Sequence, residues 1–461
     1  MTPRFRRLLL LLPLLTGTLL PLGAAQPVKG TAVPGLVLST PEDAPLTPGQ
    51  LAGVRALMSR ASAFRLGLLI ADAQTGEALY ARRPDAPYTP ASNMKLLSLG
   101  AALYTLGPGY WFSTSVTRSP GRSAQATHLT LVGGGDPSLE ASLGEHSLAG
   151  LARQVYAGGL RTVGDLWLDA HMIGAAAGQQ EAGWKIPIVE RPVSGLTLND
   201  PSAGDGAELT TTPDTRAALM RVGAVFRAEL ERAGVKVTGK LVPGPAPGPP
   251  EDGVATTRSA PLASLVRSAM KRSDNVWTEQ LYARLGVNTQ TPEWRPASPL
   301  HARAQQTRLL NRAGVNAAGL VIHDGSGLSA GDRLTPRALV GLLRSVYLRP
   351  VPRQPGASTL GPQAAFRERK NLFIEGLPRA GTGTASEEAA LLGGTLATRL
   401  PGLDVRAKTG TLPGVSALSG YLTTQSGRVL IFSVLMDGYG GPGQELRQLQ
   451  DALLRALAAD L

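Results

Sequence analysis

Apolar runs near both ends of the chain predict one sheet. Strand-like runs occupy residues 65–72, 77–81, 405–409, 418–424 and 429–436. Gln74, Thr75 and Gly76 separate the first two runs and predict a hairpin turn. Helical spacing predicts helices at residues 47–63, from about Ser92 onward, and at 446–461. Because helices lie between the two sets of strands, we expect an α+β fold whose antiparallel sheet is built from both chain ends and flanked by helices.

The middle of the chain, residues 110–253, does not continue this pattern. Its predicted strands are residues 112–117, 128–132, 163–169 and 235–242, and its predicted helices are residues 147–156 and 213–233. A run rich in Pro and Gly at 243–250 has the composition of a linker. We interpret the segment as a large inserted domain of α/β type. Its Gly133-Gly134-Gly135-Asp136-Pro137 is predicted to be an ordinary loop, because no Lys or helix start follows as in a phosphate loop.

The predicted helix at Ser92 carries the first candidate chemistry. Pro90 suits a helix start, and Ser92 and Lys95 are three residues apart, so one helical turn places both side chains on the same face. A serine becomes nucleophilic when a base takes its proton, and a lysine can be that base where burial lowers its pKa. The plain alternative is a solvated lysine and a serine at the start of an ordinary helix. Ser268 and Lys271 repeat the same spacing, so the pair alone decides nothing.

Two later motifs favour Ser92 over Ser268. They are Ser273-Asp274-Asn275 between two predicted helices, and Lys408-Thr409-Gly410 with Thr411 at the end of a predicted strand. Ser268 lies five residues before Ser273, which leaves no chain to build the rest of a site. The structural alternatives are a cluster of helix-capping residues for the first motif and an ordinary edge strand for the second. The ordered set favours an active site.

Residue usage supports this interpretation independently. Only eight of the 46 basic residues are lysines, and two of those eight stand in these motifs. Arg cannot accept a proton in a protein, whereas a buried Lys can shift its pKa and do so. Three ordered motifs are rare by chance in a chain with so few lysines.

The first 25 residues predict a secretory signal. Arginines precede a leucine-rich run at 8–22, and small residues stand at 23–25, so we expect cleavage after Ala25. An uncleaved anchor is the less favoured alternative, because Pro13 and Pro21 interrupt a run that is short for a membrane span. The predicted organisation is a signal peptide at 1–25, a first peptidase part at 26–109, an inserted domain at 110–253 and a second peptidase part at 254–461. The mature protein is expected in the periplasm or cell envelope.

Composition narrows the partners. The chain has no Cys, which excludes lipoprotein attachment, disulfides and thiolate zinc sites. Without the three signal arginines the formal net charge falls from +12 to +9, which favours anionic partners such as wall polymers or lipid headgroups. Nucleic acid is not expected, because the chain has no dense Lys/Arg run and aromatic residues are 5%.

The three motifs in this order resemble those of penicillin-binding proteins and class A β-lactamases. The large insert between the first two resembles class C low-molecular-mass penicillin-binding proteins, which are D-alanyl-D-alanine carboxypeptidases and endopeptidases. Further stretches that resemble this family are 133–137, 192–196, 324–329 and 406–411. The run at 380–394 departs from it, because it looks longer than the usual link of the family.

The resemblance implies a role for each motif residue. Ser92 would attack the carbonyl between two D-alanines with Lys95 as base, and Ser273 and Lys408 would pass a proton to the leaving amine. The remaining implied contacts with substrate come from Asn275, Thr409, Gly410, Thr411 and Asp136, the last holding the diamino acid of the stem peptide. Penicillin and other β-lactams would acylate Ser92. The resemblance implies no cofactor and no metal.

Three other functions stay open from the sequence. Gly327-Leu328-Ser329-Ala330-Gly331 matches the nucleophile elbow of α/β-hydrolases, but no His follows it and Pro336 comes too soon for the required helix. A β-lactamase shares the motifs but spaces the first two more closely. A non-catalytic protein that binds the wall or senses β-lactams could keep the same scaffold.

Overall fold

The computed structural model describes residues 52–61, 65–121, 123–173, 193–199, 215–248, 252–287, 297–351 and 360–460. The predicted signal peptide at 1–25 and its cleavage point lie outside these residues. Pro192 of the 192–196 stretch and the last two prolines of the predicted linker also lie outside them. Within the described ranges no helix is long and apolar enough to cross a membrane.

The two ends of the chain form a five-stranded antiparallel sheet in the order β2-β1-β11-β10-β9. The strands are β1 Arg65–Asp72, β2 Ala78–Arg82, β9 Asp404–Leu412, β10 Val415–Thr423 and β11 Val429–Asp437. β1 pairs with β11 along its whole length, which joins residues that are far apart in the sequence. The sheet assembled from both chain ends is therefore confirmed.

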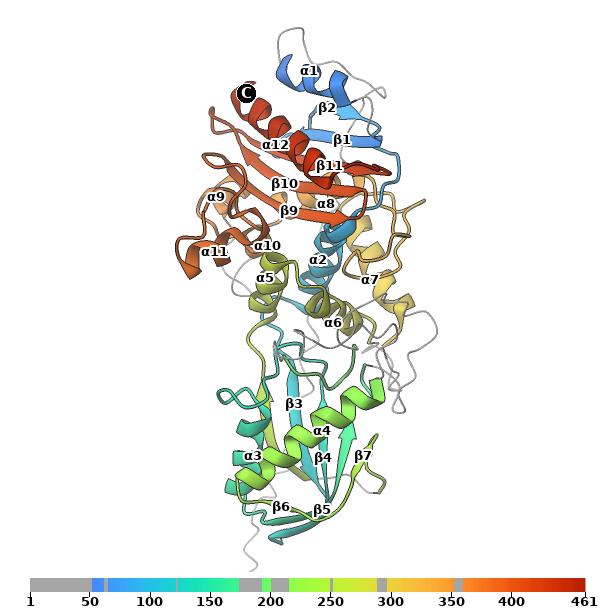
Figure 1. Cartoon of the computed structure of the whole chain (residues 1–461), viewed down its shortest axis with the longest axis vertical. Coiled ribbons are helices and arrows are strands. Elements are labelled where there is room, and N and C mark those ends of the chain that lie inside the picture. The colour runs from blue at the N-terminus through green and yellow to red at the C-terminus, as the bar shows by residue number, and fades with distance from the viewer. Residues whose placement is uncertain are drawn as a thin grey trace, which may run out of the picture. The chain divides into compact units, whose positions relative to one another are not determined.

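Helices cover both faces of this sheet (Figure 1). Alternation along β1 sends Leu66, Leu68 and Ile70 into a core with α1 Ala52–Arg60 and α12 Gly443–Asp460. The side chains between them, such as Leu69, enter a second core with α2 Met94–Leu106 and α8 Pro336–Leu348. All residues of β11 are buried for this reason. The strands of a sheet that is covered on both faces have continuous apolar sequences, and the strands of this sheet have such sequences.

Most of the remaining helices outside the insert join the second core, but Leu396 of the last 3-10 turn lies in the first. They are α5 Leu262–Arg272, α6 Asn275–Leu285, α7 Pro299–Arg312, α9 Pro362–Arg367, α10 Leu372–Gly376, α11 Glu387–Gly393 and the 3-10 turn η4 Gly394–Leu396. Residues 94–103 of α2 are all buried, because α5, α6, α7 and α8 contact it from several sides. A helix enclosed in this way can hold a lysine away from water.

The insert has its own sheet, in the order β6-β5-β4-β3-β8, with β7 beside β5. Its elements are β3 Ser113–Arg118, β4 Gln125–Gly133, α3 Leu148–Ala157, β5 Thr162–Asp169, α4 Thr215–Arg232, β6 Lys236–Val237, β7 Leu241–Pro243 and β8 Asp252–Arg258. β4 and β5 are parallel and α3 lies between them in sequence, so the expected α/β character is confirmed. The core of the insert includes Leu131, Leu166 and Phe226.

Two details of the insert differ from the sequence interpretation. The strand predicted at 235–242 is two short strands, because the chain bends where Gly239 approaches Asp165. A Cβ on Gly239 would lie 2.6 Å from the Asp165 backbone nitrogen, so only glycine fits there. The sequence also did not indicate β8, a polar strand that begins just after the predicted linker. β8 pairs with β3 and runs across the predicted boundary at residue 253.

Candidate active site

Ser92 lies in η2, the 3-10 turn Ala91–Asn93 that leads into α2. Its side chain is half-buried between the buried Ala91 and Asn93. Ala91 has a φ of 45°, a left-handed conformation that costs energy for a residue with a side chain. The surrounding contacts therefore hold this turn in one shape and keep the Ser92 hydroxyl in a fixed place.

Lys95 lies one turn further along, fully buried, and its ammonium has three oxygen acceptors. Lys95 Nζ donates to Ser92 Oγ at 3.0 Å, to Asn275 Oδ1 at 2.6 Å and to the Ser326 carbonyl oxygen at 2.8 Å. Three donated bonds use all three N–H groups of a protonated lysine. In this arrangement Lys95 carries its proton, and it must release it before it can accept one from Ser92.

A second pair of serine and lysine belongs to the same set of residues. Lys408 Nζ donates to Ser273 Oγ at 2.8 Å and to the Thr409 carbonyl oxygen at 2.9 Å. Lys408 is also fully buried, and its two bonds fit a neutral amine as well as an ammonium. The Lys408 carbonyl oxygen accepts a bond from Asn93 Nδ2 at 3.0 Å, which ties β9 to the turn that carries Ser92.

Burial shifts the pKa of both lysines. It lowers the pKa of Lys95 to about 8, while the charges of Glu279, Asp324 and Asp274 oppose the shift. It also lowers the pKa of Lys408 well below its ordinary range, and the positive charge of Lys95 lowers it further. The site therefore holds two buried amines whose pKa values both lie below the ordinary value of a lysine.

The sequence left open whether Ser273-Asp274-Asn275 is a helix-capping cluster, and one of its three residues, Asp274, is a helix cap. Asp274 caps α6, because its side chain accepts from the Trp277 backbone nitrogen at 2.9 Å. Ser273 ends α5 with a left-handed φ of 57°, and its hydroxyl turns to Lys408. Asn275 begins α6 and contacts Lys95. One motif thus both caps a helix and points two side chains at the lysines.

The strand β9 lies directly against η2, and Gly410 makes this approach possible. A Cβ on Gly410 would lie 2.8 Å from the Pro90 carbonyl oxygen, so a side chain here would push the strand away. Thr409, before the glycine, donates from Oγ1 to Thr395 Oγ1 at 2.7 Å. Thr411, after it, is exposed and begins a groove of about 870 Å³ formed with residues 412–414 and 438–441 and Gly443.

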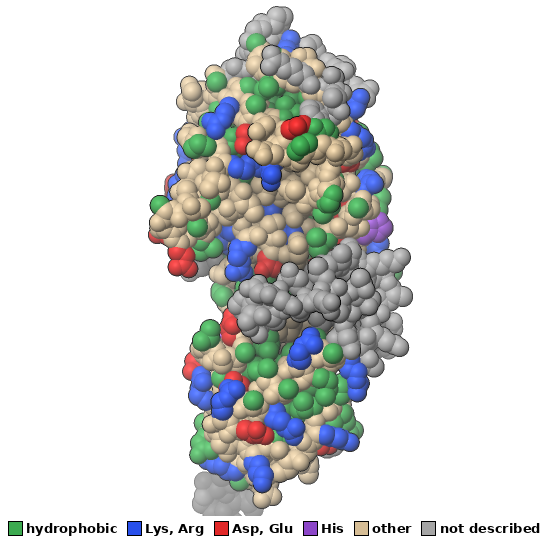
Figure 2. Space-filling view, viewed as in Figure 1, with side chains coloured by type: hydrophobic (Ala, Val, Ile, Leu, Met, Phe, Trp, Pro, Cys, Tyr) green, Lys and Arg blue, Asp and Glu red, His purple; other side chains and the backbone are tan. Residues whose placement is uncertain are grey.

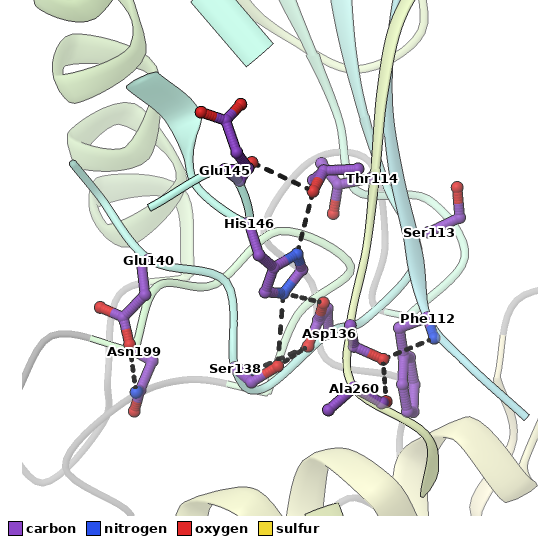
Figure 3. Close-up of polar contacts among 12 residues, drawn as sticks. Phe112, Ser113, Thr114, Asp136, Ser138, Glu140, Glu145, His146, Asn199 and Ala260 are labelled. Atoms are coloured by element: carbon purple, nitrogen blue, oxygen red, sulfur yellow. Dashed lines mark hydrogen bonds and ion pairs between the residues drawn. The ribbon is translucent and has the colours of Figure 1, made fainter. Parts of the chain in front are cut away.

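Asp136 does not join these residues through any contact in the described part of the chain. It is buried in the insert, where Oδ1 accepts bonds from Ser138 N at 2.8 Å and Ser138 Oγ at 2.7 Å. Its Oδ2 lies 2.8 Å from His146 Nε2, and His146 Nδ1 lies 3.0 Å from Thr257 Oγ1. Figure 3 shows Asp136 enclosed by Ser138 and His146. Oδ1 is therefore bonded within the insert, whereas the buried Oδ2 lies beside His146 without accepting a hydrogen bond from the described residues.

The second pair with the same spacing, Ser268 and Lys271, has a different structure. Lys271 is buried, but its Nζ donates to the carbonyl oxygens of Leu377 and, at 2.7 Å, Leu392. Leu392 lies in α11, close to Thr395. Lys271 therefore connects α5 to the chain segment that contacts Thr409, and Ser268 is not its partner in either bond.

Replacing Lys271 with methionine is expected to destabilise the protein most at alkaline pH. Burial lowers the pKa of Lys271 to about 7 from 10.5 in the unfolded chain. The unfolded chain thus binds the extra proton between these values, so this residue's contribution to the free energy of unfolding rises from pH 7 to about 10. At pH 9 the variant loses hydrogen bonds worth about 1–3 kcal/mol. Urea unfolding at pH 6.5 and 9 measures this.

The control for Lys271→Met is Lys370→Met, because Lys370 is exposed. We expect this control to match the unchanged protein at both pH values. A Lys271→Met protein as stable as the unchanged protein at pH 9 would contradict the role of Lys271 as a connection between α5 and α11.

The α/β-hydrolase alternative has no support in the geometry. Ser329 lies in a loop, where its backbone nitrogen donates to Asp324 Oδ2 at 2.7 Å and its Oγ accepts from Gly331 N at 3.2 Å. The next helix, α8, begins only at Pro336. A nucleophile elbow requires a sharp turn directly into a helix. Nor is any group of three or more His, Asp or Glu side chains placed to hold a metal within the described ranges.

The sequence indicated no role for several residues that contact the motif residues or the backbone bonded to them. Glu279, Ser326 and Thr395 lie near the site without belonging to the three motifs. For Ser326 the signal was the polar and Gly-rich stretch 324–329, which the resemblance included without a role. The signal for Glu279 was weaker: it is the single acidic residue of the helix that follows Asp274.

An α+β fold in which a serine contacts a buried lysine, opposite a second serine and lysine, defines the penicillin-binding class of active-serine enzymes. The chain belongs to the D-Ala-D-Ala carboxypeptidase 3 (S13) family, whose profile matches residues 55–187 and 195–459. The resemblance drawn from the motifs is confirmed, and the chain is a serine-type hydrolase.

Three similar proteins agree with this assignment. The D-alanyl-D-alanine carboxypeptidase of Actinomadura sp. (strain R39) is 31% identical over 470 residues, which cover 85% of this chain and 81% of that protein. The structure of penicillin binding protein 4 from Haemophilus influenzae has a TM-score of 0.66 at 20% identity and covers 88% of this chain and 98% of its own. A predatory peptidoglycan endopeptidase from Bdellovibrio bacteriovorus has a TM-score of 0.53 at 16% identity, covering 86% and 92%. The two structures establish the fold.

The surface carries its positive charge in a scattered form. Figure 2 shows Lys and Arg side chains spread over the visible face rather than gathered into one patch. A dispersed positive charge attracts polyanions weakly and over a wide area.

Proposed function

We propose that this chain is a D-Ala-D-Ala carboxypeptidase that cleaves peptidoglycan stem peptides through an acyl-enzyme on Ser92. The observation that carries the proposal is the Lys95 Nζ to Ser92 Oγ hydrogen bond of 3.0 Å inside a buried site. The bond joins a nucleophile to a base whose pKa burial has lowered to about 8.

The acylation step follows from this arrangement. Neutral Lys95 takes the Ser92 proton while Ser92 Oγ bonds to the carbonyl carbon between the two D-alanines. The backbone N–H groups of Ser92 and Thr411 stabilise the oxyanion. The carbon–nitrogen bond then breaks, and the terminal D-alanine leaves as an amine with a proton that Ser273 passes from Lys408. The proton that Lys95 took from Ser92 returns to Lys408, which restores both lysines before the next turnover. Support for the transfer through Ser273 is the 2.8 Å bond between Lys408 Nζ and Ser273 Oγ.

The remaining motif residues hold the substrate. Asn275 Oδ1 lies 2.6 Å from Lys95, so its amide nitrogen is free to turn toward a substrate carbonyl. Lys408 and Thr409 would bind the terminal carboxylate, and Gly410 lets the substrate backbone lie beside β9. Asp136 stays a candidate contact for the diamino acid of the stem peptide: Ser138 binds its Oδ1, while its buried Oδ2 accepts no hydrogen bond from the described residues.

Water completes the cycle by attacking the acyl carbon, which releases the shortened peptide and returns the proton to Ser92. A β-lactam would acylate Ser92 by the same route and deacylate slowly. Fast deacylation would instead make the protein a β-lactamase. Cleavage of peptide cross-links is a second candidate activity, favoured by the open groove that begins at Thr411 and leaves room for a larger substrate.

We further propose that the protein is exported to the cell envelope after removal of residues 1–25. The arginines, the leucine-rich run and the small residues at 23–25 support this location. Its substrate, peptidoglycan, lies in the same compartment.

The test combines two measurements on the purified mature chain. Incubation with benzylpenicillin is expected to add the mass of one penicillin, and peptide mapping is expected to place it on Ser92. Incubation with diacetyl-L-Lys-D-Ala-D-Ala is expected to release D-alanine. An adduct at another residue would overturn the assignment of Ser92, and a folded chain without adduct or D-alanine release would favour a non-catalytic wall-binding protein.

A further inference from the structure

Three carboxyl groups lie buried behind Lys95, outside the predicted catalytic motifs. Glu279 lies on α6, one turn after Asn275, and Asp324 and Asp332 lie in the connection before α8. Their exposed fractions are 0%, 1% and 0%. Burying a carboxylate raises the free energy of the folded state unless hydrogen bonds or opposite charges compensate. Three such groups side by side therefore suggest a function.

Glu279 holds the peptide that accepts a bond from Lys95. Its Oε1 accepts from Ser326 N at 2.6 Å, and both oxygens accept from Gly325 N at 3.1 Å. The Ser326 carbonyl oxygen then accepts the Lys95 bond at 2.8 Å. The Gly325 carbonyl oxygen accepts from Ser98 Oγ at 2.6 Å, so the peptide is tied to α2 from its other side. α2 and α6 pack together, and Glu279 determines where this backbone lies between them.

The hydrogen bonds also show where the protons of the cluster are. Asp324 accepts from Gly327 N at 2.6 Å and Ser329 N at 2.7 Å, which suits a carboxylate. Asp332 Oδ1 accepts from His323 N at 2.7 Å, but its buried Oδ2 accepts no hydrogen bond from the described residues. Burial raises the pKa of Asp332 to about 9, and the Asp324 charge adds to this. Asp332 therefore keeps its proton at neutral pH.

Several charges face Lys95 from the elements packed around it. Glu279 opposes the loss of its positive charge most, followed by Asp324 and by Asp274 at the start of α6. Lys408 on β9 is the neighbouring cation. Burial raises the pKa of Glu279 to about 7, with Asp324 adding to the shift, so Glu279 is largely ionised at the pH where Lys95 titrates.

We propose that Glu279 is a positioning residue for Lys95: its carboxylate holds the Ser326 carbonyl against the lysine, and its negative charge keeps the proton on the lysine. The proposal rests on the proposed function of Lys95 as the base. Glu279 does not touch the substrate. It acts on the reaction through the place and the charge of Lys95.

Glu279→Gln is expected to change the pH dependence of acylation by benzylpenicillin. Without the negative charge Lys95 loses its proton more easily. The midpoint of the acid limb of the plot of acylation rate against pH therefore moves down by about one pH unit. The amide also cannot accept all the backbone N–H bonds, so the maximal rate falls by about 10- to 100-fold. Glu279→Asp keeps the negative charge but moves the carboxylate away from the backbone N–H groups of Gly325 and Ser326. The midpoint is therefore expected to stay near its original value while the maximal rate falls.

The matched control is Asp332→Asn, which replaces a neutral buried acid with a neutral amide in the same cluster. Its midpoint is expected to equal that of the unchanged protein. A purely structural role of Glu279 would lower the maximal rate and the stability without moving the midpoint in Glu279→Gln, and that result would overturn the proposal. If Glu279→Gln does not fold, a maximal rate in Glu279→Asp equal to that of the unchanged protein would overturn it.

A second readout separates this inference from the proposed function. Lysine labelled with ¹³C at Cε gives few signals, because the sequence has eight lysines, and Lys95→Arg identifies the Lys95 signal. Its titration midpoint is expected to fall in Glu279→Gln. An unshifted midpoint overturns the role of Glu279 even where penicillin binds, whereas a shifted midpoint in a protein that never acylates upholds Glu279 and overturns the proposed function.

Discussion

Ser92→Ala is expected to abolish the penicillin adduct and to reduce D-alanine release by at least about 10⁴-fold. The variant removes the atom that bonds to the substrate, and no neighbouring hydroxyl can replace it. Ser273 Oγ, the other serine hydroxyl of the motifs, accepts a hydrogen bond from Lys408 rather than from Lys95. Intact mass after incubation with benzylpenicillin and a D-alanine release assay measure both effects.

The chain supplies its own matched control in Ser268→Ala. Ser268 precedes Lys271 at the same spacing at which Ser92 precedes Lys95, but Lys271 donates to Leu377 and Leu392 instead. Ser268→Ala is expected to form the adduct and release D-alanine at the rate of the unchanged protein. An adduct that persists in Ser92→Ala would contradict the assignment of the nucleophile.

Lys95→Met is expected to lower the acylation rate about a thousandfold while Ser92 stays in place. Methionine fills a similar volume but cannot accept a proton, so the Ser92 hydroxyl attacks without a base. The acid limb near pH 8 is also expected to disappear, because the group that titrates with a pKa of about 8 is gone. The measurement is the rate of adduct formation from pH 6 to pH 10.

Two further variants test whether Lys95 acts as the base or only as support. Lys95→Ala leaves space for a small amine, so methylamine is expected to restore part of the acylation rate, more at high pH where the amine is neutral. The double variant Ser92→Ala/Lys95→Met is expected to be no slower than Ser92→Ala, because the two residues act as a unit. Full activity in Lys95→Met would contradict the role of Lys95 as the base and would favour Lys408, the other buried amine that the described residues place at the site.

Local sequence patterns determined much of this protein. The strands of the main sheet were readable because each is a short apolar run bounded by turn residues, and β1 has the predicted limits 65–72. The sequence singled out the candidate residues Ser92, Lys95, Ser273, Asn275 and Lys408, because few structural roles require these side chains in this order. The structure places Ser92 and Asn275 against Lys95 and Ser273 against Lys408, and Asn93 links the two groups by donating to the Lys408 carbonyl oxygen.

Tertiary structure alone decided how the lysines are held. The acceptor for the third bond of Lys95 is the carbonyl oxygen of Ser326, 231 residues away, and a backbone carbonyl has no signature in the sequence. The role of Glu279 likewise depends on the Ser326 peptide packed against it, which the sequence does not show. β8 forms in spite of its polar composition, because it pairs with β3. Asp136 is the converse case, a motif residue whose partners belong to the insert. Residue type and spacing specify the local elements and the reactive groups, whereas burial and charge environment arise only when distant segments pack.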